Sequence, residues 1–246
     1  MLNNQNKKGG ISYLDYTWNP ISMKCTPVSE GCKNCWHLGI LNRFNPDIDK
    51  PTLREKELYA PMKIKGQARI GVQFMGDLFH EDIPHDWHVD IFDKVICSPG
   101  NSYLYLTKRP GRMKESFDKI LKDYFDHDFW MMDVWAGVSV ENQRYENRIM
   151  ELKDIQAAVR WVSFEPLIGP VNIIPSMFSW VNWVVIGCES GSGRRPCELE
   201  WINDIVNQCR AARCPVFVKQ VPINGRVSHN PEEWPDNIAV REFPKN

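Results

Sequence analysis

Short apolar runs alternate with stretches long enough to form a helix, and this alternation constrains the fold of the chain more than any other feature. The runs are rich in β-branched and aromatic residues, which favour strands. They cover residues 69–75, 103–107, 134–138, 159–163, 183–187 and 215–219. Helical candidates lie between them at residues 87–98, 112–124, 143–152 and 199–212. Strands that alternate with helices predict a parallel sheet.

We therefore expect an α/β fold, a partial (β/α) barrel of about six to seven parallel strands. Residues 7–16 are the candidate for an additional strand before the cysteines. A chain of 246 residues with 43% hydrophobic residues can bury the core of one such domain. No repeat, linker or low-complexity segment divides the sequence, so we expect a single domain over residues 1–246.

The composition argues against several classes of protein. The first ten residues are polar, and nowhere do eighteen apolar residues follow one another without a charge, so we expect a soluble, cytoplasmic protein without a membrane partner. In that compartment the eight cysteines are expected to stay reduced. The net charge of −1 provides no general attraction to phosphate, so any contact with nucleic acid must come from local patches.

Side chains that can bind ligands or move protons follow the apolar runs directly. The carboxyl ends of parallel strands meet at one mouth of a barrel, where substrates and cofactors bind. Each group alone can also be a helix cap or an ordinary ion pair. Six clusters at equivalent positions favour a site, and they are Gly76-Asp77, Lys108-Arg109, Ser139-Val-Glu141, Phe164-Glu165-Pro166, Cys188-Glu189-Ser190-Gly191 and Lys219-Gln220.

Three cysteines, Cys25, Cys32 and Cys35, lie close together near the start of the chain. Three thiolates form an incomplete metal site, because a 4Fe-4S cluster with three protein ligands keeps one iron open for another molecule. His37 leaves an alternative open, since it would complete a structural Cys3His zinc site or close the fourth position of the cluster. The other five cysteines have no recognisable ligand spacing and are expected to be ordinary thiols.

Ordered motifs over residues 17–220 resemble a known family. The motifs are Thr17-Trp-Asn-Pro20, Ser29-x-Gly-Cys32-x-x-Cys35, Gly76-Asp-Leu-Phe-His-Glu-Asp82, Leu106-Thr-Lys-Arg-Pro110, Gly137-Val-Ser-Val-Glu141, Ser163-Phe-Glu-Pro-Leu-x-Gly-Pro170, Glu189-Ser-Gly191 and Lys219-Gln220. Together they resemble the phage-associated three-cysteine proteins, which are related to radical S-adenosylmethionine (SAM) enzymes. Several motifs in one order identify a family more securely than any single motif does.

The resemblance implies a radical SAM enzyme in which Cys25, Cys32 and Cys35 bind a 4Fe-4S cluster and SAM chelates the open iron. A reductant such as flavodoxin or ferredoxin would supply the electron that cleaves SAM to a 5'-deoxyadenosyl radical. The reaction would be an isomerisation, a cleavage or a transfer. The expected substrate is a nucleotide or modified nucleobase, for example in the hypermodification of phage DNA in the host cytoplasm.

The resemblance also implies roles for the polar residues that follow the strands. Asp77 is expected to bind the amino group of SAM, and Lys108, Arg109 or Lys219 its carboxylate. Ser139, Glu141 and Glu165 are candidates for binding ribose or substrate. The catalytic candidates are Glu141, Glu165, Glu189 and Cys188, the last being either a reactive thiol or an ordinary substitution.

The sequence departs from the commonest radical SAM pattern at two points. Six residues separate Cys25 from Cys32, where that pattern has three, and Trp36-His37 stand where relatives commonly have Tyr-Ala. Two alternatives therefore stay open. One is a zinc-stabilised barrel protein with a Cys3His site and a non-radical or binding role, and the other is an interaction module without catalysis.

Overall fold

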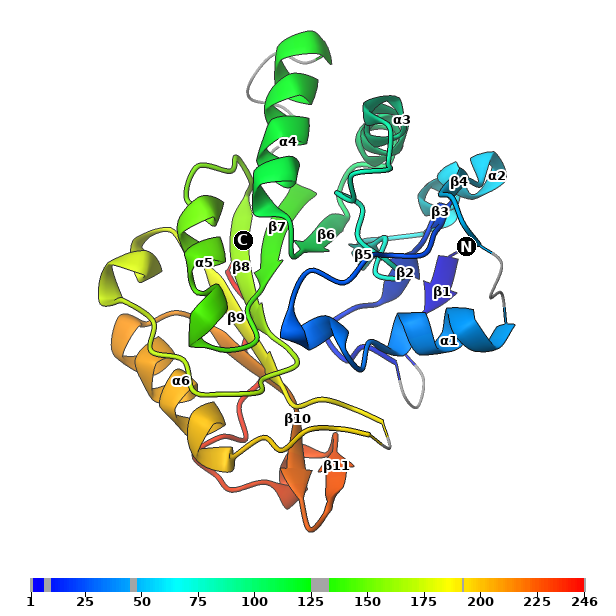
Figure 1. Ribbon diagram of the computed structural model, residues 1–246. Helices are drawn as coiled ribbons and strands as arrows, with labels where there is room; N and C mark the ends of the chain where they lie inside the picture. Colours follow the sequence, from blue (N-terminus) through cyan, green and yellow to red (C-terminus); the bar gives the residue numbers. More distant parts are fainter. Residues whose placement is uncertain (1, 7–9, 45–47, 125–132, 192, 246) are drawn as a thin grey trace. The chain divides into compact units, whose positions relative to one another are not determined.

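The computed structural model describes residues 2–6, 10–44, 48–124, 133–191 and 193–245. One nine-stranded sheet has its strands in the order of the chain (Figure 1): β1 (Leu2–Asn4), β2 (Tyr16–Trp18), β5 (Arg69–Val72), β6 (Ser102–Thr107), β7 (Val134–Ser139), β8 (Val159–Phe164), β9 (Trp183–Gly187), β10 (Val216–Ile223) and β11 (Arg226–Ser228). A further small sheet pairs β3 (Ile21–Ser22) with β4 (Thr52–Leu53).

The sheet is largely parallel. The pairs β2 with β5, β5 with β6, β8 with β9 and β9 with β10 are parallel, whereas β1 with β2 and β10 with β11 are antiparallel. The expected α/β class with a mainly parallel sheet is therefore confirmed. All six apolar runs form strands at the expected places.

The helices are α1 (Trp36–Phe44), α2 (Glu55–Leu58), α3 (His85–Ile96), α4 (Pro110–Tyr124), α5 (Asn147–Leu152) and α6 (Leu199–Ala212). Three of the four expected helices are continuous, and the fourth is divided into the 3-10 turn η4 (Gln143–Tyr145) and α5. Another short 3-10 turn, η1 (Glu30–Cys32), lies in the segment from Cys25 to Cys35, which we call the cysteine run. Within the described ranges, no helix has the length and apolar character needed to cross a bilayer.

An additional strand does precede the cysteines, but it is β2 (Tyr16–Trp18), so the expected bounds of 7–16 are wrong for residues 10–15. Residues 7–9 lie outside the described residues, and residues 10–15 form turns before β2 begins at Tyr16. The backbone N–H of Leu14 donates to the carbonyl of Ile11 at 2.9 Å. Tyr13 and Leu14 are neighbours and both are buried, so they pack inward from a turn instead of pointing to opposite faces of a strand.

The chain divides into two compact units. The first unit contains residues 1–26, 37–136 and 154–158, and the second contains residues 27–36, 137–153 and 159–246. The chain passes between the units five times, after residues 26, 36, 136, 153 and 158, so the first crossing lies between Cys25 and Cys32 and the third lies within β7. The expectation of a single domain over the whole chain stays a prediction.

Aromatic residues fix β6 against the helices of the first unit. Tyr105 of β6 stacks on Phe92 of α3, with ring centroids 5.2 Å apart, and Phe117 of α4 meets both rings edge-on. All three side chains are fully buried. Burial of such large rings is among the strongest stabilising contributions in a core. It fixes the end of β6, where Thr107, Lys108 and Arg109 follow.

The core of the second unit contains two packed tryptophans. The rings of Trp161 on β8 and Trp183 on β9 lie 5.4 Å apart, and a Cβ on Gly137 of β7 would lie only 2.3 Å from the Trp161 indole. Only glycine fits beside this ring without a shift. Because side chains alternate along a strand, Ser139 shares a face with Gly137, and Ser163 shares one with Trp161. The polar side chains therefore follow the aromatic core toward the carboxyl ends of the strands.

Candidate functional site

Arg109, which follows β6, is the centre of a polar cluster in the first unit. Its guanidinium donates from Nη1 to Asp77 Oδ2 at 3.1 Å and from Nε to Glu81 Oε1 at 2.9 Å. Nη2 donates to the carbonyl and hydroxyl oxygens of Thr26 at 3.2 and 3.0 Å. Nη1 also lies 3.8 Å from the sulfur of Cys25. One side chain thus connects the first cysteine with two carboxylates.

Asp77 is fixed by donors on both of its oxygens. Oδ1 accepts from the Phe79 N–H at 3.0 Å and from the Thr107 hydroxyl at 2.7 Å. Oδ2 accepts from the Lys108 N–H at 3.2 Å in addition to Arg109. Each oxygen therefore has two donors, and the amino group of a ligand would have to displace one of them. In this arrangement Asp77 orients Arg109.

The pKa values of Arg109 and Glu81 shift in the directions that favour their charged forms. Burial disfavours the charged guanidinium, but the hydrogen bond with Glu81 and the negative charge of Asp77 outweigh it, so the pKa of Arg109 is raised above its usual value. The hydrogen bond from Arg109 lowers the pKa of Glu81. A fixed cation beside a cysteine favours the thiolate, which is the form that binds metals. Cys25 has such a neighbour in Arg109.

Glu141 follows β7 in the second unit, as Arg109 follows β6 in the first. Its side chain carries a negative charge where Arg109 carries a positive one. Its side chain has 0% exposure, and Oε1 accepts from the Ser29 hydroxyl at 2.6 Å. Oε2 accepts from Arg148 Nη1 at 2.9 Å, and the same nitrogen donates to the carbonyl of Ser139 at 2.8 Å. A Cβ on Gly31 would lie 2.4 Å from Glu141. The run from Ser29 to Cys32 is therefore packed directly against this carboxylate.

Glu189, which follows β9, binds the same run further along. Oε2 accepts from Asn34 Nδ2 at 2.9 Å, and the Arg195 guanidinium donates to both oxygens at 3.1 and 2.5 Å. Arg195 also donates from Nη1 to the carbonyl of Glu30 at 2.8 Å. Burial opposes ionisation of Glu189, but the hydrogen bonds from Arg195 and Asn34 prevail and lower its pKa.

Two other predicted residues, Glu165 and Lys219, pair with each other. Lys219 Nζ lies 2.5 Å from Glu165 Oε1, and the two side chains are 14% and 20% exposed. Cys188 directly precedes Glu189 in the sequence and is buried. This burial raises the pKa of its thiol to about 12. The thiol is therefore protonated near neutral pH, which favours an ordinary buried residue over a nucleophile.

The donor chemistry of the cysteine run fits an iron-sulfur cluster, since it offers three half-buried thiols. Among the residues that the structure describes, no three His, Cys, Asp or Glu side chains are already gathered closely enough to hold a metal ion. His37 is buried, which lowers its pKa, and its Nε2 donates to the carbonyl of Met23 at 3.0 Å. A zinc ion bound through that nitrogen would have to displace the carbonyl.

Several residues of the site are not among the sequence-based candidates. Arg148, Thr26, Ser29 and Asn34 form its contacts, although neither composition nor strand ends point to them. A partial signal exists for Arg148, which lies seven residues after Glu141 in a segment expected to be helical. Thr26, Ser29 and Asn34 lie inside the cysteine run. The sequence therefore placed them beside the predicted metal site but gave them no role of their own.

No curated protein and no solved structure matches the chain significantly. A family model does match, and it covers residues 8–232, which is most of the chain. The chain therefore belongs to the DUF5131 family, whose description is protein of unknown function.

Proposed function

We propose that this protein is a radical SAM enzyme in which Cys25, Cys32 and Cys35 bind a 4Fe-4S cluster. The observation that carries the proposal is the way in which the cysteine run is held. Three of its residues contact a charged side chain directly after a strand: Thr26 contacts Arg109, Ser29 contacts Glu141, and Asn34 contacts Glu189. Each contact lies within one unit.

Such contacts support the proposal because ligands of parallel α/β proteins bind at the carboxyl ends of the strands. A loop of cysteines attached to these ends by buried ionic groups is suited to presenting a reactive cofactor to a substrate. The mainly parallel sheet agrees with this architecture. The partial barrel of radical SAM enzymes is the finer form of the fold that we propose.

Each residue of the site has a role in this proposal. A cluster of this type would supply the electron that cleaves the sulfonium of SAM into methionine and a 5'-deoxyadenosyl radical. Arg109 stabilises the thiolate of Cys25, and Asp77 holds Arg109 in place. Glu141 and Glu189 hold the segment that contains Cys32 and Cys35. Their hydrogen bonds with Ser29 and Asn34 support a positioning role, which we propose in place of the catalytic one that the sequence suggested.

Lys219 and Glu165 are the best candidates for contact with SAM or substrate. They form a pair that is partly open to solvent, so a ligand carboxylate can exchange with Glu165 for the ammonium of Lys219. Lys108 is the second cation that we assign to the SAM carboxylate, and Ser139 stays a candidate for ribose. These roles rest on residue chemistry and on the resemblance to the three-cysteine proteins.

The substrate is proposed to be a nucleotide or a modified nucleobase. This part of the proposal, like the flavodoxin or ferredoxin reductant and a role in phage DNA modification in the host cytoplasm, rests on the resemblance alone. A base within a duplex would have to be extruded to reach a radical in a barrel. A free nucleotide needs no such step.

The proposal is tested by anaerobic reconstitution with iron and sulfide, followed by incubation with SAM and dithionite. We expect a brown protein with about four irons per chain, and the products 5'-deoxyadenosine and methionine. Cys32→Ala should abolish both the cluster and the products. Cys97→Ala is the matched control, because Cys97 is exposed and lies outside the cysteine run. A colourless protein with one tightly bound zinc would replace the radical proposal with the zinc alternative.

A further inference from the structure

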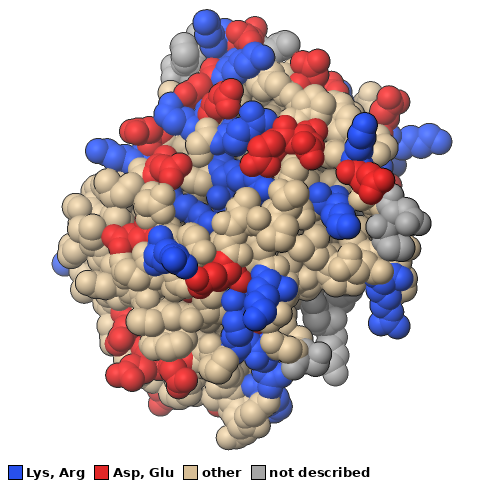
Figure 2. Space-filling view, viewed as in Figure 1, with Lys and Arg blue, Asp and Glu red and all other residues tan. Residues whose placement is uncertain are grey.

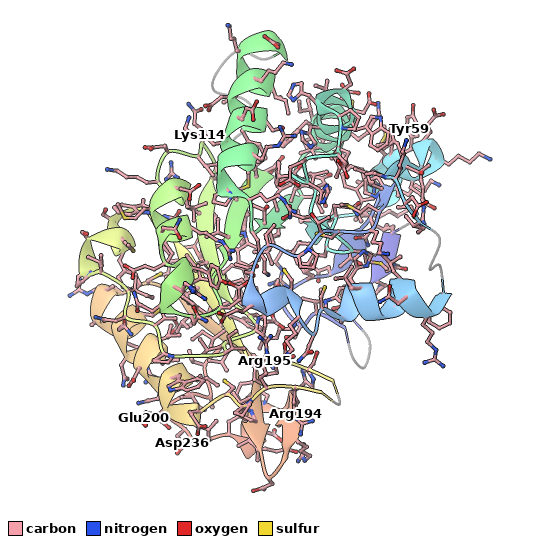
Figure 3. The ribbon with its side chains drawn as sticks, in the orientation of Figure 1. Tyr59, Lys114, Arg194, Arg195, Glu200 and Asp236 are labelled. Carbon is pink, nitrogen blue, oxygen red and sulfur yellow. The ribbon has the colours of Figure 1, made fainter. Side chains whose placement is uncertain are left out.

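A pocket of about 360 Å3 lies in the second unit, between the segment that precedes α6 and the hairpin of β10 and β11. Prolines and buried cysteines form part of its wall, and two arginines and one glutamate provide its charge. The lining of the pocket includes Cys188, Glu189, Arg194, Arg195, Cys197 and Gly225. Figure 2 shows basic side chains gathered on this face over β10 and β11. Arg194 and Arg195 are labelled in Figure 3.

The two arginines of the pocket differ in how their charge is balanced. Arg195 forms an ion pair with Glu189 at 2.5 Å. Arg194 donates from Nη1 to the Gly191 carbonyl at 3.3 Å and from Nη2 to the Gly225 carbonyl. In the described part of the chain, no carboxylate forms an ion pair with Arg194. Neutral carbonyls orient a guanidinium without cancelling its charge, so Arg194 is a fixed, uncompensated cation.

The remaining wall of the pocket adds no negative charge. Burial raises the pKa of both Cys188 and Cys197 to about 12, so both thiols are neutral near pH 7. Glu189 is the one carboxylate of the lining, and Arg195 neutralises it. The lining therefore has a net positive charge, supplied by Arg194, and the remaining N–H groups of its planar fork can bind an anion.

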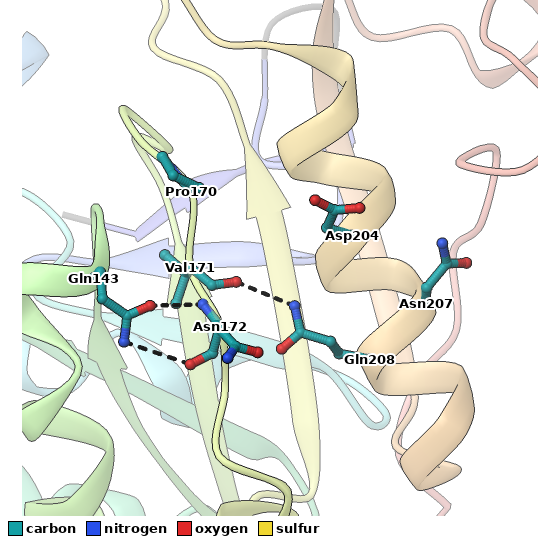
Figure 4. Close-up of a pocket in the computed structure, with 7 residues that line it drawn as sticks. All are labelled: Gln143, Pro170, Val171, Asn172, Asp204, Asn207 and Gln208. Carbon is teal, nitrogen blue, oxygen red and sulfur yellow. Dashed lines mark hydrogen bonds between the residues drawn. The ribbon is translucent and has the colours of Figure 1, made fainter.

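A second pocket in the same unit shows that volume alone does not indicate a ligand. It measures about 590 Å3 and lies beside α6 (Figure 4), but no basic residue lines it. Its amide side chains are used by the neighbouring backbone. Gln143 Oε1 accepts from the Asn172 N–H at 2.7 Å, and Gln208 Nε2 donates to the Val171 carbonyl at 3.1 Å. These amides hold an extended segment in place, and Asp204 is the one charged side chain of the lining.

We propose that the Arg194 pocket binds the phosphate group of a small molecule, a phosphate monoester such as a nucleoside monophosphate. Guanidinium is the side chain best matched to phosphate oxygens. The volume lies at the small end of the range for ligand pockets, roughly 300–1,000 Å3, which suits a monoester. The site needs no metal or cluster, so it stands whether or not the radical chemistry proposed above is correct.

The test is a titration of the 15N-labelled protein with inorganic phosphate at constant ionic strength, followed through the Nε–H signals of arginine. We expect a saturable shift of the Arg194 signal, and tighter binding of adenosine monophosphate than of phosphate. Arg194→Gln should weaken phosphate binding at least about tenfold. Arg210→Gln, an exposed arginine on α6 outside the pocket, should change it less than about twofold.

Three results would overturn the assignment. They are the absence of a saturable shift, an equal loss of binding in Arg194→Gln and Arg210→Gln, and tighter binding of a single-stranded oligonucleotide than of the monophosphate. If Arg194→Gln does not fold, Arg194→Lys replaces it. Lysine keeps the positive charge but lacks the planar set of N–H donors of the guanidinium. That variant should bind phosphate measurably more weakly than the wild type, and unchanged affinity would also contradict the proposal.

Discussion

The two units hold the cysteine run with opposite charges. In the first unit a buried cation, Arg109, contacts the run, and Asp77 and Glu81 stand behind it. In the second unit buried carboxylates contact the run, and arginines stand behind them: Glu141 with Arg148, and Glu189 with Arg195. The cysteines consequently have different surroundings. Cys25 lies beside a guanidinium, whereas Cys32 lies near the Ser29 hydroxyl, with 3.7 Å between sulfur and oxygen.

In both units, a charged side chain that contacts the cysteine run forms an ion pair with a second side chain that is also buried. Side-chain exposure is 6% and 8% for Arg109 and Asp77, and 7% and 0% for Arg148 and Glu141. A buried ion pair stabilises a protein little compared with an apolar pair. The loss of one partner is nevertheless costly, because the other charge stays buried without compensation. Variants that remove one partner are therefore the sharpest way to compare the two units.

The largest effect is expected for Arg109→Met. It leaves Asp77 buried without a cation and removes the contacts with Thr26, so the free energy of unfolding should fall by about 3–5 kcal/mol. Urea denaturation measures the change. Lys119→Met, at an exposed position on α4, is the control and should cost less than about 0.5 kcal/mol. Equal effects of the two variants would remove the argument for a buried ionic centre in the first unit.

A smaller loss, about 2–3 kcal/mol, is expected for Glu141→Gln in the second unit. Glutamine still accepts from Ser29, and Arg148 keeps the Ser139 carbonyl and the Tyr145 ring, whose centroid lies 4.5 Å from the guanidinium carbon. The same denaturation experiment applies, with Glu151→Gln on the exposed face of α5 as the control. If Glu141→Gln lowered the free energy of unfolding more than Arg109→Met does, the ionic centre of the second unit would be the more important one for stability.

Gly31→Ala tests the close packing of the run against Glu141. The added Cβ would lie 2.4 Å from the carboxylate side chain, so we expect a loss of about 1–2 kcal/mol. Gly39→Ala in α1 is the matched control, because its Cβ would meet no atom within 4 Å. That change should be neutral or stabilising, since alanine is the better helix former. Thermal denaturation of both variants distinguishes packing from backbone effects.

The smallest effect concerns pH and Glu189. Because its pKa in the folded protein is lowered from the usual value of 4.5, its contribution to stability is present above pH 4.5 and is lost as the pH falls further. Glu189→Gln should therefore be less stable than the wild type at pH 7, and the gap should narrow below pH 4.5. Denaturation midpoints measured over this range provide the comparison. A gap that stays constant with pH would assign the effect to shape instead of charge.

The sequence predicts the strands well because their signal is local. Runs such as residues 103–107 and 183–187 contain consecutive β-branched and aromatic residues, and each forms a strand in the structure. The turn at residues 10–15 escapes the same reasoning, because Tyr13 and Leu14 have strand-like side chains and are buried from a turn. Local propensity does not reveal which neighbour a side chain meets.

The site was predictable only in part, for the same reason. Asp77, Arg109, Glu141 and Glu189 were found because they follow strands, where parallel sheets gather polar groups. Their partners in the cysteine run are far away in sequence, as in the hydrogen bond of Ser29 with Glu141 across 112 positions. No spacing rule reaches that far in one sequence. Glu141 and Glu189 stay catalytic candidates of the sequence, and their hydrogen bonds with the cysteine run are the basis on which we propose positioning roles for them.

The paired indoles of Trp161 and Trp183 have a practical consequence. Two indole rings 5.4 Å apart couple their strong far-ultraviolet transitions, so they add a circular dichroism band that depends on their mutual orientation. Both tryptophans belong to the second unit. The band is thus an optical reporter for that unit, and a variant of the Arg109 cluster that keeps it intact has disturbed the first unit alone.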